Sequence, residues 1–238
     1  RHINKFVYDK KKIKIFKIDL IKDTKKLIGL LKKIKPSIIL DHASICMVQE
    51  SWKYPKRYFD INVKSRFDII EELSNKSFLK KYIYISTPEI FGSSKDKIEE
   101  KSSGFNPSTP YAASKLLAEI NFKHALVSKK FPLIISRFSN FYGPGQPLYR
   151  LIPKALISLK KKLSFPLHGN GNSKRNFIYT DDFCEGINRM ITKGSIGNIY
   201  HFSGDKYVSI KEIIKIICWL KKVKFNKFLK ITQDRTGK

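Results

Sequence analysis

Residues 82–92 read YIYISTPEIFG. The first five predict a strand, because aromatic and β-branched residues of this kind favour extended backbone. Ser86, Thr87 and Glu89 then lie at the carboxyl end of that strand. Open α/β sheets bind their ligands outside the carboxyl ends of their strands. The stretch therefore predicts an α/β fold with a polar site at this strand end.

A second informative stretch, residues 110–115, reads PYAASK and places Tyr111 and Lys115 four residues apart. On a helix, such a pair points to one face. An ammonium close to a phenol favours the phenolate, so we expect Lys115 to lower the pKa of Tyr111 from about 10. A phenol tuned in this way can take a proton from a sugar or alcohol hydroxyl. The simpler interpretation is a packed Tyr with a solvated Lys on an amphipathic helix.

Strands and helices alternate along the first part of the chain, which predicts a doubly wound parallel sheet. The predicted strands are 13–18, 37–40, 82–86 and 131–136, and the predicted helices are 23–34, 56–75 and 107–129. In the helix 56–75 we expect the following side chains to point inward: Phe59, Val63, Phe67, Ile70 and Leu73.

The pattern changes after Gly143-Pro144-Gly145 and predicts a smaller mixed α/β lobe. Its predicted helices are 149–162, 181–193 and 209–222, and its predicted strands are 197–202 and 227–231. We place the boundary near residue 146 and allow for the chain to cross back once. The fold class is thus a doubly wound parallel, Rossmann-like α/β sheet with a smaller mixed α/β lobe.

The net charge is unusual, since 48 Lys and Arg against 20 Asp and Glu give +28 over 238 residues. The lysines are spread along the chain, mostly beside apolar segments where they form the solvated face. No aromatic–basic RNA motif or zinc-finger spacing accompanies them. We therefore expect neither a nucleic-acid nor a membrane partner, and a non-catalytic basic binding protein is the alternative of another class.

Targeting and redox signals are few. The sequence contains no run of about 18 apolar residues and no apolar segment of a signal peptide near Arg1. Cys46, Cys184 and Cys218 lie far apart, without metal-ligand spacing. This favours reduced thiols in a cytoplasm, each a small buried residue, and no metal.

Four motifs, taken in order, resemble the extended short-chain dehydrogenase/reductases, specifically the NAD-dependent epimerase/dehydratase family. They are STPEIFG at 86–92, the Tyr111–Lys115 pair, RFSNFYGP at 137–144, and GNG at 169–171 followed by RNFIYTDD at 175–182. Each motif is weak alone, but their order and spacing are specific. The match is strongest to the dTDP-glucose 4,6-dehydratases and runs from about residue 13 to the end.

The resemblance also implies a part that this sequence lacks. Family members open with a strand and a Gly-x-x-Gly-x-x-Gly turn that holds the NAD pyrophosphate at a helix N-terminus. Here the first glycine is Gly29. Residues 234–238 resemble a motif that relatives carry well before their end. We expect a fragment truncated at both ends, the rival being a degenerate protein that no longer binds NAD.

For the cofactor, NAD, the resemblance implies a binding domain over residues 1–146 that lacks its glycine-rich unit. Asp19 would contact the adenine, although a simple turn aspartate is the plainer interpretation. Ala43 lies in the stretch that passes the nicotinamide, and Ser86 lines the cofactor site. Tyr111 and Lys115 would complete that site, with Lys115 on the nicotinamide ribose.

For the substrate, a nucleotide sugar, the resemblance implies an incomplete binding lobe over residues 147–238. Asn140 and Arg175 would hold the diphosphate, since a planar guanidinium suits phosphate. Thr87 would bind the sugar 4-hydroxyl and Tyr111 would take its proton. Glu89 would then remove the C5 proton before water leaves from C6. The product would be a 4-keto-6-deoxy sugar nucleotide, and the enzyme a lyase of polysaccharide biosynthesis.

Pro88 departs from the family pattern. The dTDP-glucose enzymes carry an Asp between Thr and Glu that protonates the departing C6 hydroxyl. Glu89 could serve as both base and acid here, as in related enzymes with Ser at this position. UDP-glucuronate decarboxylases and 4-epimerases share the fold and are the alternatives, although simple epimerases usually lack the Glu. Family members usually form homodimers through two long helices each, here 56–75 and 107–129.

Overall fold

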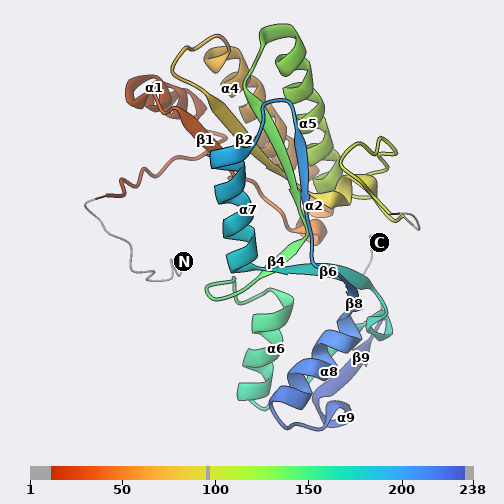
Figure 1. Cartoon of the computed structure of the whole chain (residues 1–238). Helices are drawn as coiled ribbons and strands as arrows, with labels where there is room; N and C mark the ends of the chain where they lie inside the picture. Colours follow the sequence, from red (N-terminus) through yellow and green to blue (C-terminus); the bar gives the residue numbers. More distant parts are fainter. Residues whose placement is uncertain (1–11, 95–96, 234–238) are drawn as a thin grey trace.

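The computed structural model describes residues 12–94 and 97–233, and a parallel sheet forms its centre (Figure 1). The strands are β1 (Ile38–Asp41), β2 (Lys81–Ser86), β3 (Leu133–Phe138) and β7 (Ile199–Phe202), in the order β1-β2-β3-β7. All three neighbouring pairs are parallel. The predicted parallel α/β fold is therefore confirmed.

Helices cover both faces of this sheet, as expected for a doubly wound fold (Figure 1). On one face lie α1 (Thr24–Ile34), α4 (Ser65–Leu73) and α5 (Pro110–Lys129), and α7 (Thr180–Lys193) lies on the other. Alternate residues of β2 serve the two cores: Tyr82 and Tyr84 pack toward α4 and α5, whereas Ile83 and Ile85 pack toward α7. The strand is therefore buried on both faces.

The second lobe is a mixed α/β unit built from short elements (Figure 1). It contains β4 (Asn140–Tyr142), α6 (Leu151–Lys160), β5 (Phe165–His168), β6 (Lys174–Tyr179), β8 (Tyr207–Ser209), α8 (Ile210–Leu220), α9 (Phe225–Phe228) and β9 (Leu229–Thr232). Within it β6 pairs in parallel with β4 and antiparallel with β8. The chain leaves this lobe once, through α7 and β7, to complete the large sheet. The boundary near residue 146 remains a prediction.

The predicted strand at 13–18 is wrong. These residues are irregular, and the side chains of Ile15 and Phe16 are 62% and 51% exposed. Alternation alone does not make a strand, because the ladder hydrogen bonds require a partner. No described strand lies beside this segment. The tail motif at 234–238 falls outside the described residues.

The helix predicted at 56–75 is present as a continuous helical stretch over residues 55–73, with a π-helical turn inside it. The structure has α2 (Val48–Lys53), α3 (Pro55–Phe59), a π-helical turn η1 (Asp60–Lys64) and then α4. Val63, Ile70 and Leu73 are buried as expected, but Phe67 is 46% exposed while Arg66 is 1% exposed. The inward face of this helix includes the polar residues Asn62, Ser65 and Arg66, so counting apolar positions placed Phe67 wrongly.

Candidate active site

The end of β2 is shaped by a short 3₁₀-helix, η2 (Pro88–Phe91). Thr87 precedes it with extended backbone, and its Oγ1 accepts a hydrogen bond from the Glu89 N–H at 3.3 Å. Pro88 suits the first helical position because it has no N–H to leave unpaired. Gly92 ends the turn at φ +64°, and a Cβ there would lie 2.2 Å from the Asn106 carbonyl oxygen. The turn therefore fixes Glu89 next to Thr87.

Helix α5 brings the Tyr–Lys pair to the same place. Thr109 caps its N-terminus by accepting from the Ala112 N–H at 3.1 Å, and Pro110 starts the helix. Tyr111 and Lys115 are 8% and 2% exposed and lie on the buried face of the helix. The interpretation of Lys115 as a solvated residue is therefore wrong.

Tyr111, Thr87 and Glu89 form one cluster. The Tyr111 hydroxyl is hydrogen-bonded to the Thr87 side chain, and the negative charge of Glu89 acts on it electrostatically. Burial is the main cause that raises the pKa of Tyr111 well above its usual value, and Glu89 adds to it. The Thr87 hydrogen bond and the Arg150 charge act in the opposite direction.

Lys115 does not lower the pKa of Tyr111, so that part of our prediction is wrong. Its Nζ donates to the Ile85 carbonyl at 2.6 Å and lies 4.2 Å from the centre of the Tyr84 ring. Burial, together with the charge of Arg66, lowers the pKa of Lys115 to about 7. The pair shares a helix face, but the amine is directed at the backbone of β2.

Glu89 lies in a partly desolvated position where the charges of two arginines act on it. Burial raises its pKa, while Arg175 and Arg150 oppose that shift. A carboxyl with a raised pKa exchanges its proton closer to neutral pH than an ordinary Glu does. Glu89 is therefore suited to both taking and giving a proton.

The second lobe contributes Asn140 and Arg175 from neighbouring parallel strands. Asn140 lies opposite Phe177 in the β4–β6 register, and its Nδ2 is 3.4 Å from the Asn176 carbonyl oxygen. Arg175 is exposed, donates to the Lys174 carbonyl at 2.9 Å and acts electrostatically on Glu89. Arg175 thus lies near enough to act on Glu89, with Asn140 on the adjoining strand.

Among the predicted cofactor residues, Ser86 stands out. It is 5% exposed, and its Oγ finds no hydrogen-bond partner among residues 12–94 and 97–233. The Ala43 carbonyl accepts from Arg66, which also pairs with Asp41 through Nε at 2.9 Å. An unpaired buried hydroxyl is costly in a folded protein. Ser86 therefore fits contact with a ligand.

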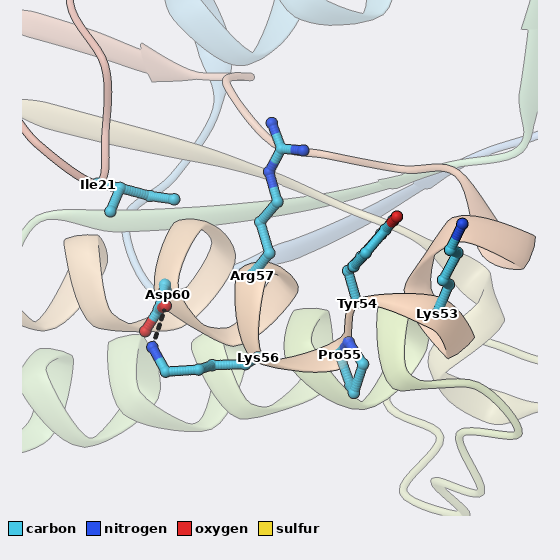
Figure 2. Close-up of a pocket in the computed structure, with 7 residues that line it drawn as sticks. All are labelled: Ile21, Lys53, Tyr54, Pro55, Lys56, Arg57 and Asp60. Carbon is cyan, nitrogen blue, oxygen red and sulfur yellow. Dashed lines mark hydrogen bonds and ion pairs between the residues drawn. The ribbon is translucent and has the colours of Figure 1, made fainter.

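Asp19 lies in an exposed turn, where its Oδ1 accepts from the Ile21 N–H at 2.8 Å. This hydrogen bond and one from Lys22 lower its pKa, and Arg57 adds a smaller effect. A surface pocket of about 430 Å³ adjoins this turn (Figure 2). It is lined by Ile21, Lys53, Tyr54, Pro55, Lys56, Arg57 and Asp60. The lining residues do not include any of the Thr87 cluster.

Two residues of the site, Cys46 and Arg150, were not predicted from the sequence. The Arg150 guanidinium donates to Cys46 Sγ at 2.9 Å, across 104 positions of sequence. Both also act electrostatically on Tyr111. No motif or spacing signals this contact, and we had interpreted Cys46 as a small packing residue.

Within the part of the chain that the structure describes, no group of three His, Cys, Asp or Glu side chains is arranged to hold a metal ion. No helix there is both long and apolar enough to cross a membrane.

The fold and site together define a Rossmann-like α/β protein with a Tyr–Lys helix beside a Thr–x–Glu strand end. The chain belongs to the NAD dependent epimerase/dehydratase family, whose family model matches residues 3–202. It is 32% identical over 208 residues to a dTDP-D-glucose 4,6-dehydratase of Dictyostelium discoideum, covering 83% of this chain and 48% of that protein. The human dTDP-D-glucose 4,6-dehydratase is 33% identical over 192 residues, covering 79% of this chain and 55% of the human protein.

A similar solved structure is DesIV, the dTDP-glucose 4,6-dehydratase of Streptomyces venezuelae, determined with NAD bound. It superposes with a TM-score of 0.83 at 26% identity, covering 92% of this chain and 67% of that one. The chain spans about half the length of the curated relatives it matches.

Proposed function

We propose that this chain carries the catalytic core of an NAD-dependent nucleotide-sugar 4,6-dehydratase acting on dTDP-glucose or a similar substrate. The observation that carries the proposal is the cluster of Thr87, Glu89 and Tyr111, in which a hydroxyl, a carboxyl with a raised pKa and a phenol meet at one strand end. The similarity to dTDP-glucose 4,6-dehydratases supports it.

The residues present fit one end of NAD. Ser86 offers an unpaired buried hydroxyl, and Lys115 lies beside it through its bond to Ile85. We propose that these two hold the nicotinamide ribose with Tyr111, that Ala43 borders the nicotinamide, and that Asp19 contacts the adenine. When bound, NAD would supply the oxidation at C4 and the matching reduction at C6 of the sugar.

In this proposal Thr87 holds the substrate 4-hydroxyl while Tyr111, in its phenolate form, accepts its proton. The ketone that forms at C4 acidifies the C5 proton, which Glu89 removes. Because Pro88 cannot donate a proton, Glu89 then returns the same proton to the departing C6 hydroxyl, and water leaves. The raised pKa of Glu89 supports such a double role. Asn140 and Arg175 hold the diphosphate.

We further propose a cytoplasmic homodimer, working in polysaccharide biosynthesis, without nucleic-acid or membrane partners. The dimer would form through α4 and α5. In support, the apolar side chains of Phe67, Leu117 and Ile120 are 46%, 40% and 37% exposed on these helices. The three cysteines Cys46, Cys184 and Cys218 are unpaired, which suits a reducing compartment.

The test is turnover by the full-length protein, purified and supplied with NAD and dTDP-glucose. We expect a 4-keto-6-deoxy product, detected by its ultraviolet absorbance after alkali, that is lost in Tyr111→Phe and Glu89→Gln. Carbon dioxide from UDP-glucuronate would instead identify a decarboxylase, and inversion at C4 an epimerase. Salt-sensitive DNA binding without turnover would favour a basic binding protein.

A further inference from the structure

Arg150 connects the two sides of the site. It lies directly before α6, on the segment that enters the second lobe, and its guanidinium is 5.6 Å from the centre of the Tyr149 ring. Its Nη2 donates to Cys46 Sγ at 2.9 Å. Cys46 belongs to the connection between β1 and α2. The contact therefore spans from the large sheet to the small lobe.

Cys46 is held in place by clamps on both of its neighbours. Asn62 binds Ile45 twice, accepting from its N–H and donating to its carbonyl, both at 3.1 Å. Tyr58 does the same for Met47, donating to its carbonyl at 2.7 Å and accepting from its N–H at 3.1 Å. Both clamping side chains are 0% exposed. A sulfur on such a fixed backbone is a well-defined anchor for a guanidinium.

The anchor of the guanidinium lies next to the reacting groups, because Tyr58, which clamps Met47, has its ring centre 6.4 Å from that of Tyr111. The charge of Arg150 acts on both Glu89 and Tyr111 in the direction that favours their ionised forms. Arg175 also acts on Glu89, but it is exposed and is bonded to its own strand. Lys115, the cation expected to serve Tyr111, is directed at Ile85 instead. Arg150 is thus a cation that acts on both groups and is held by a side-chain contact of its own.

We propose that Arg150 is a positioning residue of this site: anchored on Cys46, it supplies the positive charge that supports the carboxylate of Glu89 and the phenolate of Tyr111. The inference rests on the proposed function for its catalytic meaning. Its structural part concerns only the charge around Glu89 and can be tested without turnover.

The test follows the titration of Glu89 by NMR in protein carrying ¹³C-labelled glutamate, with the resonance assigned by its absence in Glu89→Gln. In Arg150→Gln we expect the Glu89 midpoint to rise by about one pH unit, since a nearby opposite charge shifts a carboxyl by about that amount or more. Arg150→Lys should keep most of the wild-type value. Arg189→Gln, which removes an exposed arginine on α7 paired with Glu185, should change nothing.

The anchor is tested by a second pair of variants. Cys46→Ser keeps an acceptor for the guanidinium and should titrate like the wild type, whereas Cys46→Val should move the Glu89 midpoint in the same direction as Arg150→Gln. An unchanged midpoint in Arg150→Gln, in a protein whose thermal unfolding shows that it is folded, overturns the proposal whatever the enzyme's substrate is.

Kinetics on the NAD-loaded full-length protein give a further check. If Arg150 acts through Glu89, Arg150→Gln should move the acid limb of the kcat profile together with the NMR midpoint. A rise in KM with an unmoved acid limb would show that Arg150 only binds substrate, which also contradicts the proposal. Absence of any turnover would count against the dehydratase assignment, while the NMR result would still decide the role of Arg150.

Discussion

Glu119 and Arg137 form an ion pair in which both side chains are 0% exposed, with Arg137 Nη2 2.7 Å from Glu119 Oε2 and Nε 3.1 Å from Oε1. The pair joins α5, which carries Tyr111, to β3. The guanidinium also lies 5.0 Å and 5.6 Å from the ring centres of Phe91 and Phe105. Helix α5, strand β3 and the turn after Glu89 are thus all in contact with the buried guanidinium of Arg137.

Arg137→Met should therefore destabilise the protein strongly, because it leaves the Glu119 carboxylate buried and unpaired. We expect a loss of about 3–5 kcal/mol in the free energy of unfolding, measured with urea. Removal of the exposed Arg189–Glu185 pair by Arg189→Gln should cost no more than about 1 kcal/mol. Adding Glu119→Leu to Arg137→Met should recover part of the loss, and a greater loss in the double variant would argue against the buried-charge explanation.

Gly92 should tolerate no side chain. Its φ of +64° disfavours other residues, and a Cβ would collide with the Asn106 carbonyl oxygen at 2.2 Å. Gly92→Ala should cost about 1–3 kcal/mol and disturb the turn that holds Glu89. Gly104→Ala is the control, since nothing lies within 4 Å of its added Cβ. Equal urea midpoints for the two variants would contradict this account.

In mild acid, protonation of His201 should loosen the attachment of the segment 97–106. The Nε2 of His201 lies 3.0 Å from Arg137 Nη1 and must accept, and its ring also bonds to the Ile98 backbone. The backbone N–H of His201 donates to Glu100 Oε1 at 3.2 Å. Burial and Arg137 lower its pKa, so the neutral form is favoured, and the stability it provides is lost as pH falls below about 6.5.

The measurement is the rate of tryptic cleavage at Lys97 and Lys101, relative to cleavage of a reference peptide at each pH. We expect the relative rate to rise several-fold between pH 7 and pH 5.5 in the wild type. In His201→Asn the pH dependence should disappear. The other charges facing this ring, from Glu119, Glu100 and Arg137, are unchanged in that variant.

Because of Lys115, the free energy of unfolding should increase as the pH rises from about 7 toward 10. Burial lowers its pKa to about 7 in the folded chain, so the unfolded state binds more protons in this window and the free energy of unfolding increases with pH. Lys115→Met should remove this slope and be more stable than the wild type at pH 7. Urea unfolding at pH 7, 8 and 9 measures it, and parallel profiles for the two proteins would refute a buried neutral amine.

The sequence predicted the fold well where the signal was local. The apolar runs predicted as strands became β1, β2 and β3, each paired with a parallel neighbour, and β2 and β3 are almost wholly buried. The same reasoning failed at 13–18, where an equally good alternation has no partner strand. Thr87, Glu89 and Tyr111 were found because each lies in a motif of the family, and the structure brings them together.

What could not be predicted depends on distant contacts and on burial. Arg150 meets Cys46 across 104 positions, and no spacing rule covers such a contact. The spacing of Tyr111 and Lys115 gave the shared helix face correctly. It carried no information on how deeply both are buried, and burial sets the direction of both pKa shifts.

The π turn η1 has a consequence for how one helix serves two tasks. A turn with i→i+5 hydrogen bonds delays the helical rotation by roughly one residue. Tyr58, which clamps Met47, is buried before this turn, and the residues buried after it are Ser65, Arg66, Ile69, Ile70 and Leu73. Arg66 is directed into this core, where its Nε donates to Asp41 at 2.9 Å. The extra residue in the π turn changes the rotation of the helix between its two ends. One helical segment can therefore bind the loop that carries Cys46 at its N-terminal end and fill the core at its C-terminal end.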